Sequence, residues 1–168
     1  GALYDGAHEV HSVDAAPRLN ELLELVEQAP GKCLIFCPFT SIVNIVHRKL
    51  KERWSIEKIY GDVTERDRAR IFDAFQKEDH PRLLVADPQT MAHGLDLWRA
   101  QTTIWFGPTD KAEIYQQANR RMHRPGQTFP STVVQIVSNP LEREIYKRLE
   151  SNTALQGALL DVIRRGEL

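Results

Sequence analysis

The residues best suited to chemistry lie in one short segment, residues 116–128, which contains arginines at helical spacing. On a helix, Gln117, Arg121 and Arg124 are spaced i, i+4 and i+7 and fall on one face. Pro125 disfavours helical geometry at the preceding residue, so Arg124 should lie at the helix end. Two guanidinium groups on one face can bind phosphate oxygens, whose charge must be neutralised in phosphoryl transfer. The alternative is a basic helix end exposed to water.

Short apolar runs that alternate with amphipathic stretches must position this segment. The expected strands are residues 32–37, 56–60, 82–86, 102–106 and 132–137. The expected helices are residues 16–28, 41–53, 64–75, 111–122, 142–149 and 154–163. Strands alternating with helices predict an α/β fold, with a mostly parallel sheet and helices on both of its faces.

Length and composition fit one globular domain. The 168 residues can bury a core without a disulfide or metal staple. We expect residues 1–14 to be a lead-in, residues 15–150 to form the domain and residues 151–168 to be its helical extension. The formal net charge of −1 excludes a globally basic nucleic-acid binder, so any such contact requires a local patch. No apolar stretch is long enough to span a membrane.

We interpret the cysteines and Trp105 first as structural residues of the core. Cys33 and Cys37 are spaced i, i+4 in an apolar strand, so they share one face. We expect buried thiols in a reducing compartment rather than a disulfide or a metal site. Trp105 lies in an expected strand and should be in the core. Trp98 is the better candidate for stacking on a base.

Ligands of parallel α/β sheets bind beyond the carboxyl ends of the strands. Here those ends are followed by residues 38–40, 61–64, 87–90 and 107–110. Thr40 and Ser41 can cap the helix that follows them or meet a nucleic-acid phosphate. Thr64 is an N-cap candidate as well, and Asp96 has the alternative role of a turn or cap residue.

The sequence Q-A-x-x-R-x-H-R-x-G-Q, which starts at Gln117, closely resembles the sixth conserved motif of Swi/Snf-type ATPases. The resemblance implies that Arg121 and Arg124 point at a nucleotide held by a partner RecA-like domain, with Gln117 on the same side. The resemblance also implies that this nucleotide is ATP with Mg²⁺, bound mainly by the upstream domain. Proline stands at position 125, where the family usually has an apolar residue of another type.

Residues 83–97, L-L-V-A-D-P-Q-T-M-A-H-G-L-D-L, resemble the fifth motif of that family. The part H-G-L-D-L looks most like viral or phage-encoded members. The resemblance implies that Gly94 and Asp96 lie on the nucleotide side and that Thr90 contacts DNA. The family usually has asparagine where Asp96 stands.

Two further stretches of the sequence, both between residues 32 and 75, resemble segments of the same family. Residues 32–40 resemble the fourth motif, a buried strand that ends in a polar loop, and residues 60–75 resemble the segment that follows it. The resemblance implies contacts with the DNA backbone for Thr40, Ser41, Gly61 and Thr64. It covers about residues 15–150 and implies a three-layer RecA-like domain.

The resemblance as a whole implies the second motor domain of an ATP-dependent helicase or translocase that acts on double-stranded DNA. Such motors work inside the cell, in the cytoplasm of a bacterial host or in a nucleus. The sequence has no G-x-x-x-x-G-K-[S/T] phosphate-binding loop, so we expect no ATP hydrolysis by the isolated chain. The first residue is not methionine, as expected of a chain cut from a longer protein.

Two other classes of protein compete with this hypothesis. One is a stand-alone RecA-like module that binds nucleic acid or protein and has no ATPase role. The arginine pair favours the motor domain, because a binding module does not need both arginines at helical spacing. The other is an unrelated doubly wound enzyme, for which the sequence offers neither a nucleophile–base pair nor a glycine-rich loop.

Overall fold

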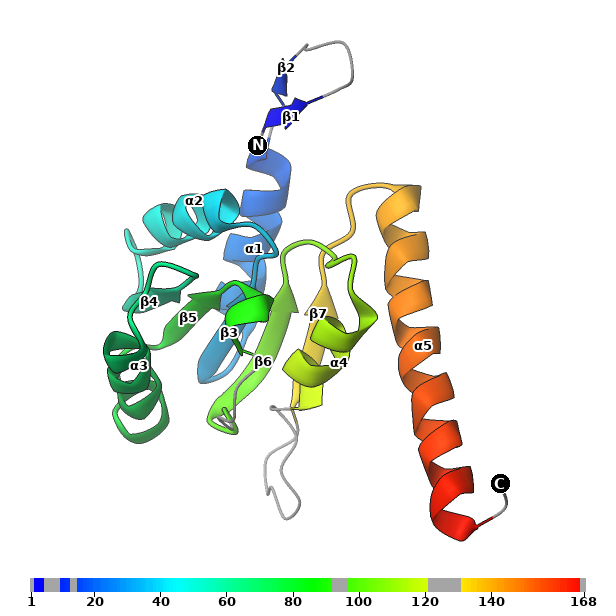
Figure 1. The fold of residues 1–168 in the computed structure, drawn as a ribbon. Helices are drawn as coiled ribbons and strands as arrows, with labels where there is room; N and C mark the ends of the chain where they lie inside the picture. Colours follow the sequence, from blue (N-terminus) through cyan, green and yellow to red (C-terminus); the bar gives the residue numbers. More distant parts are fainter. Residues whose placement is uncertain (1, 5–9, 13–14, 92–96, 121–130, 167–168) are drawn as a thin grey trace.

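The computed structural model describes residues 2–4, 10–12, 15–91, 97–120 and 131–166. Its helices are α1 (Ala16–Gln28), α2 (Thr40–Leu50), α3 (Glu65–Lys77), the short 3-10 helix η1 (Pro88–Met91), α4 (Ala112–Arg120) and α5 (Pro140–Arg165). Its strands are β1 (Ala2–Tyr4), β2 (Val10–Ser12), β3 (Lys32–Phe36), β4 (Ile56–Ile59), β5 (Leu83–Ala86), β6 (Ala100–Trp105) and β7 (Thr132–Gln135). Figure 1 shows the larger sheet at the centre of the molecule, with helices around it.

The central sheet has the strand order β4-β5-β3-β6-β7, and every neighbouring pair is parallel. Its middle strand, β3, is buried along its whole length, as expected of a strand that is covered on both faces. Because the strands are parallel, they all end at one side, which we call the carboxyl end of the sheet. The side where they begin is the amino end. The predicted α/β fold is confirmed.

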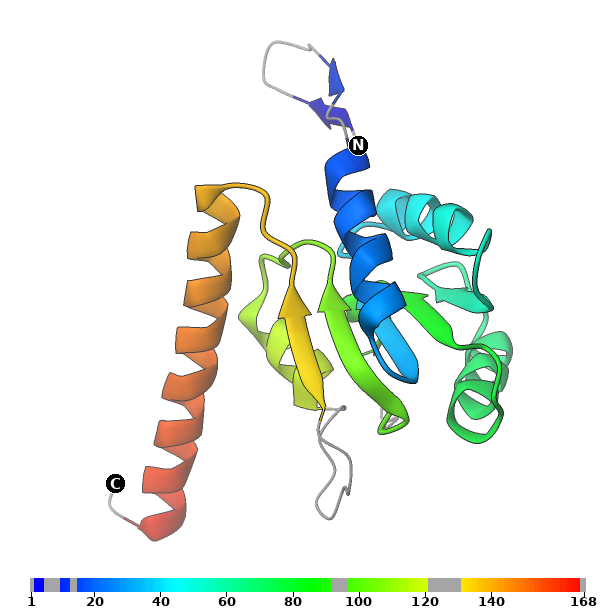
Figure 2. The ribbon, with the colours of Figure 1, turned by 180° about the vertical axis from the view of Figure 1, so that it is seen from behind.

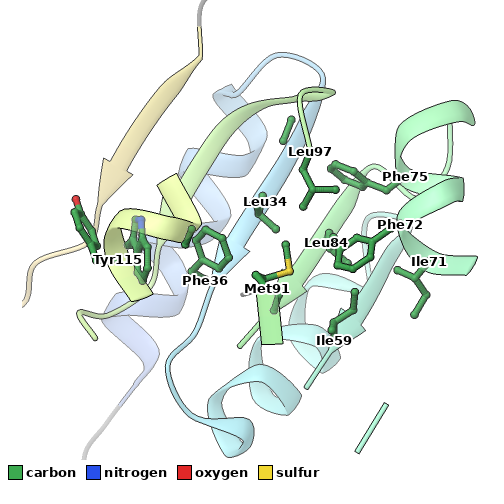
Figure 3. Packing of buried hydrophobic residues seen from close by; sticks show 14 of the residues in the cluster. Leu34, Phe36, Ile59, Ile71, Phe72, Phe75, Leu84, Met91, Leu97 and Tyr115 are labelled. Carbon is green, nitrogen blue, oxygen red and sulfur yellow. The ribbon is translucent and has the colours of Figure 1, made fainter. Parts of the chain in front are cut away.

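The sheet separates two apolar clusters, because alternate residues of a strand point to opposite faces. On one face Cys33 and Ile35 pack with residues of α1 and α2. On the other face Leu34 and Phe36 pack with residues of α3, α4 and α5. Figure 3 shows this second cluster, with Phe72 and Phe75 of α3 at one side of it and Tyr115 of α4 at the other. The helices predicted on both faces are therefore present (Figure 2).

The predicted burial of the cysteines and of Trp105 is confirmed. Cys33 and Cys37 are free thiols in the same apolar cluster. Burial raises the pKa of the Cys33 thiol to about 11, and burial also raises the pKa of Cys37, which is completely enclosed. Both thiols are therefore protonated and unreactive at neutral pH. Trp105 is fully buried in β6.

The two ends of the chain differ from the sequence-based expectation. Residues 2–4 and 10–12, expected as a lead-in, pair as the antiparallel strands β1 and β2, which are too short to show a period in the sequence. The two helices expected near the carboxyl terminus form one helix, α5. Ser151 and Asn152 favour helices only weakly, but neither removes a backbone donor as proline does, so the helix continues. No helix within the described residues is long and apolar enough to cross a membrane.

At the amino end of the sheet, Arg82 fastens the end of α1. Its guanidinium group donates to the carbonyl oxygens of Val26 at 2.9 Å, Ala29 at 2.9 Å and Gly31 at 3.1 Å. The guanidinium carbon also lies 5.7 Å from the ring centroid of Trp54. The last carbonyls of a helix have no partner within the helix. Arg82 therefore caps α1 and the turn that follows it.

Lys32 and Arg99 have the same kind of role at the amino end. Lys32 Nζ donates to the carbonyl of Pro81 at 2.7 Å and lies 4.9 Å from the ring centroid of Phe75. Arg99 Nη1 donates at 3.0 Å to the carbonyl of Gln76, in the last turn of α3. Burial, and then the nearby charge of Arg99, lower the pKa of Lys32. Both cations are thus bonded to the backbone of the domain itself.

The long helix α5 starts at the carboxyl end of the sheet, where an ion pair fastens it to α1. Arg18 of α1 pairs with Glu142 at 2.5 Å and donates to the carbonyl of Phe106 at 2.7 Å. Glu142 also accepts a hydrogen bond from the amide of Ser138 at 2.8 Å. One turn further along, Tyr146 is buried against the sheet. The first turns of α5 are therefore fixed to the body of the domain.

Candidate nucleic-acid interface

Three connections at the carboxyl end of the sheet enclose a crevice of about 500 Å³. They join β3 to α2, β5 to η1 and β6 to α4. The lining comes from residues 38–40, 87–89 and 108–111, with Ile145 of α5 completing it. Ligands of parallel α/β sheets bind at such a place, beyond the carboxyl ends of the strands. Three of the four predicted strand-end loops therefore meet in one site.

The first wall of the crevice is the start of α2. Phe39 is its N-cap residue, with an extended backbone (φ −129°, ψ 135°), and its carbonyl accepts from the amides of Ile42 and Val43 at 3.0 Å. Thr40 and Ser41 are the first helical residues, and both are exposed. No described side chain caps this helix. The prediction that Thr40 or Ser41 caps it was wrong, because the helix begins one residue earlier, after a side chain without an acceptor.

The second wall is the turn from β5 into η1, which Asp87 holds together. Its carboxylate accepts from the amide of Gln89 at 3.0 Å, and its carbonyl accepts from the hydroxyl of Thr90 at 2.7 Å. Burial raises the pKa of Asp87, and the Gln89 amide and the charge of Lys111 oppose this shift. Thr90 is half-buried and uses its hydroxyl proton within the turn. It has no proton left to donate to a phosphate.

The third wall is the connection from β6 to α4. Thr109 is buried, and its hydroxyl oxygen accepts from the amide of Lys111 at 3.3 Å. Asp110 and Lys111 are exposed at the surface of this wall. The lining thus includes two carboxylates, those of Asp87 and Asp110, and one ammonium group. This balance disfavours a phosphate inside the crevice and suits an uncharged group that can hydrogen-bond.

The fourth strand-end loop, from β4 to α3, is also at the carboxyl end of the sheet but outside the lining of the crevice. Thr64 is the N-cap of α3, as predicted. Its hydroxyl oxygen accepts from the amide of Asp67 at 3.2 Å, and its proton is donated to the carboxylate of Asp67 at 3.0 Å. Gly61 is exposed, and a Cβ added there would meet no atom within 4 Å. The backbone at Gly61 is therefore accessible to a ligand.

Gln117 lies on α4, which starts at the carboxyl end and runs back along the sheet toward the amino end (Figure 1). Tyr115 and Ala118 of this helix are buried. Trp105 of β6 packs against this helix. Its ring centroid lies 4.8 Å from that of Tyr115, and its Nε1 donates to the side-chain oxygen of Asn119 at 3.0 Å. Gln117 is exposed on the outer face of the helix. The structure thus separates Gln117 from the crevice.

The remaining predicted nucleotide-site residues lie outside the described residues: Gly94, Asp96, Arg121 and Arg124. Trp98, the predicted base-stacking residue, is at the amino end of the sheet, just before β6, and away from the crevice. The exposed aromatic ring at the crevice is that of Phe39. The sequence reasoning missed Phe39 and Lys111. Their positions just after β3 and β6 were the signal that could have found them.

The fold is that of a RecA-like α/β domain, with a crevice built from strand-end loops at the carboxyl end of its sheet. Residues 17–126 match the helicase conserved C-terminal domain family. The chain belongs to this family, and the predicted resemblance to the second RecA-like domain of Swi/Snf-type proteins is confirmed.

Two relatives illustrate this relationship. The chain is 30% identical over 148 residues to DNA repair protein RAD5 of Cryptococcus neoformans, a match that covers 84% of this chain and 12% of the relative. It is 26% identical over 151 residues to the protein CHROMATIN REMODELING 19 of Arabidopsis thaliana, covering 85% of this chain and 19% of the relative. The chain therefore spans less than a fifth of these relatives. Both are eukaryotic and give no support to the expected likeness to phage-encoded members.

Two solved structures share the fold. The C-terminal part of the Fun30 ATPase domain has a TM-score of 0.68 at 23% identity, covering 78% of this chain and 43% of that one. The C-terminal domain of the DEAD-box protein Dbp5 has a TM-score of 0.71 at 19% identity, covering 82% of this chain and 78% of that one. The predicted three-layer RecA-like architecture is confirmed.

Proposed function

We propose that this chain is the second motor domain of an ATP-dependent DNA translocase and works with an upstream RecA-like domain of the same protein. The proposal depends above all on one observation. The family match runs to residue 126 and so includes Arg121 and Arg124, whereas the sequence contains no phosphate-binding loop. In this proposal the upstream domain binds the phosphates of the nucleotide, and this domain adds Arg121 and Arg124 to the same site.

The described part of α4 fits this role. Gln117 is exposed on the outer face of the helix, and Arg121 follows it at i+4 in the sequence. Tyr115 and Ala118 bury the opposite face, so the outer face can meet the upstream domain. ATP with Mg²⁺, bound mainly by that domain, supplies the phosphoryl group for hydrolysis. Arg121 and Arg124 act as arginine fingers that stabilise the negative charge on the transferring group.

The carboxyl end of the sheet contacts double-stranded DNA in this proposal. Thr40 and Ser41 are exposed in the first turn of α2, where backbone amides have no partner within the helix and can bind a phosphate. The accessible backbone at Gly61 offers a second contact. Asp87 and Asp110 disfavour phosphates within the crevice. The phosphate backbone of DNA should therefore pass along the start of α2, outside the crevice.

The test measures DNA-stimulated ATP turnover of the protein that includes the upstream domain. Arg121→Ala and Arg124→Ala should each lower turnover on the order of a hundredfold or more, because an arginine finger stabilises the transition state. ATP binding and folding should persist. Arg120→Ala is the matched control, since this exposed neighbour ends α4, and it should retain turnover to within about twofold. Near-normal turnover in both finger variants would contradict the proposal, and this domain would then be a binding module that takes no part in ATP hydrolysis.

A further inference from the structure

Phe39 differs from the other phenylalanines in the described part of the chain. Its side chain is 67% exposed, whereas Phe36, Phe72, Phe75 and Phe106 are all buried at 5% exposure or less. The buried rings belong to the core clusters or pack against them. The Phe39 ring lies at the crevice and adds little to the core. Its exposure therefore has no explanation in the packing of the fold.

The backbone holds the Phe39 ring in a fixed place. Pro38 precedes it, with a φ angle restricted by its own ring, and is half-buried. The carbonyl of Phe39 accepts from the amides of Ile42 and Val43 at 3.0 Å each, which fixes this residue at the start of α2. Only the two side-chain torsions of Phe39 remain to be ordered when a ligand binds, so the entropic cost of contact is small.

The charges around the ring determine which part of a ligand can reach it. Thr40 and Ser41, the proposed phosphate contacts, follow Phe39 directly in the first turn of α2. Across the crevice are the carboxylates of Asp87 and Asp110, which repel phosphate oxygens. A DNA strand whose phosphate is held at Thr40 must therefore turn its sugar and base, not a second phosphate, toward the crevice. That path crosses the Phe39 ring.

We propose that Phe39 packs against the sugar or base of the DNA nucleotide whose phosphate is held by Thr40 and Ser41, and so positions the strand. The inference rests on the proposed function, in which DNA passes the carboxyl end of the sheet. Aromatic rings stack on the bases of single-stranded nucleic acids; in a duplex, where the bases stack on one another, the ring can pack against the deoxyribose or a base edge that is open in a groove. The crevice beside the ring combines apolar residues, such as Pro88 and Ile145, with polar ones, such as Gln89 and Lys111, and a contact of Phe39 with protein is an outcome that the second experiment below detects.

The first experiment measures the Kd of the protein, including its upstream domain, for a duplex oligonucleotide. Phe39→Ala should raise the Kd about tenfold, and Phe39→Trp should restore it to within about twofold. The slope of log Kd against log salt should not change, because no charge is removed and no counterion release is lost. Leu141→Ala is the control, an apolar residue of α5 that is 70% exposed, and its Kd should equal that of the wild type. An unchanged Kd in Phe39→Ala overturns the proposal.

The second experiment replaces Phe39 with the photocrosslinker p-benzoylphenylalanine in the same protein and irradiates it with labelled duplex DNA. An adduct on DNA supports the proposal, whereas an adduct on a peptide of the upstream domain overturns it. Thr40→Glu and Ser41→Glu, which place a carboxylate where hydroxyls or backbone amides would hold the phosphate, separate this inference from the proposed function. If they weaken DNA binding and Phe39→Ala does not, only the role of Phe39 fails. If none of the three weakens binding, the DNA contacts of the proposed function fail with it.

Discussion

The two ends of the sheet use their polar side chains in opposite ways. At the amino end, Arg82, Lys32 and Arg99 donate to backbone carbonyls at 2.7–3.1 Å and fasten helix ends and turns. At the carboxyl end, Thr40 and Ser41 are exposed at the start of α2, which no described side chain caps. Hydrogen-bonding capacity is satisfied within the domain at the amino end and remains available at the start of α2, whereas the hydroxyls of Thr64, Thr90 and Thr109 are bonded within their own turns.

This difference shows why a count of positive charges does not locate a phosphate site. The three cations at the amino end contribute to any such count, yet each already has backbone acceptors. At the carboxyl end the phosphate contacts we propose are hydroxyls and amides, which add nothing to the net charge. A buried or bonded charge stabilises the fold, and an available donor binds a ligand.

Arg82→Ala is expected to have the largest effect on stability among the variants that test this difference between the two ends of the sheet. The loss of three hydrogen bonds from a charged group should lower the free energy of unfolding by about 2–4 kcal/mol. Urea unfolding measures this, with Arg53→Ala as an exposed control that should cost less than about 0.5 kcal/mol. The DNA affinity of the folded variant should equal that of the wild type. If stability persisted and DNA affinity fell, the amino end would be a binding surface, and the difference we draw between the two ends of the sheet would be wrong.

Thr64→Ala examines a residue at the carboxyl end whose hydroxyl already has a partner. The loss of the N-cap bond to Asp67 should lower the free energy of unfolding by about 1 kcal/mol, and Thr64→Ser should retain most of it. Any contact of this loop with DNA should use the backbone, so DNA affinity should stay within about twofold of the wild type. Thermal melting and a binding titration measure the two quantities. A larger loss of affinity, restored by serine, would show that the hydroxyl itself binds DNA.

The smallest expected effect is that of Asp87→Asn, which removes a carboxylate from the crevice. Burial raises the pKa of Asp87, so the folded state favours the protonated acid, and the ionised carboxylate destabilises the fold as pH rises through that pKa. Asparagine retains an acceptor for the amide of Gln89. Because the carboxylate is partly exposed and solvent screens its charge, the variant should gain no more than about 0.5 kcal/mol at pH 7, and nothing below about pH 3, where the acid is protonated in both states.

Melting curves at both pH values check this prediction for Asp87→Asn. A loss of stability at pH 7 would show instead that the charge of Lys111 outweighs the cost of burying the carboxylate. DNA affinity at low salt should rise about twofold, since one repulsive charge is removed from the carboxyl end. No change in affinity at low salt would place the DNA path farther from the crevice than we propose.

The parts of the fold that follow from local rules could be predicted. The continuous apolar run of β3 indicated a strand covered on both faces, and its whole length is buried. Thr64 was predicted as an N-cap because its side chain can accept from a backbone amide, and it does. The turns after α1, β3 and β4 contain Pro30, Pro38 and Gly61, residue types that commonly end regular elements.

Features that depend on position in three dimensions could not be predicted. The exposure of Phe39 was missed because an aromatic residue after an apolar strand resembles core, and the crevice beside it forms only when three distant connections meet. The start of α2 was placed too late, since Phe39 lacks the side-chain acceptor that marks most N-caps. The continuity of α5 was missed because weak helix formers at Ser151 and Asn152 suggested a break.

The single helix α5 has a mechanical consequence. Its start is clamped by the Arg18–Glu142 pair beside the crevice, and it continues for 26 residues. Such a helix is a stiff lever about 39 Å long, at 1.5 Å per residue. A tilt of about 10° at the clamped end moves the far end by about 7 Å, on the same geometry. A small rotation of the start of α5 thus corresponds to a much larger displacement of its far end, at the opposite side of the molecule.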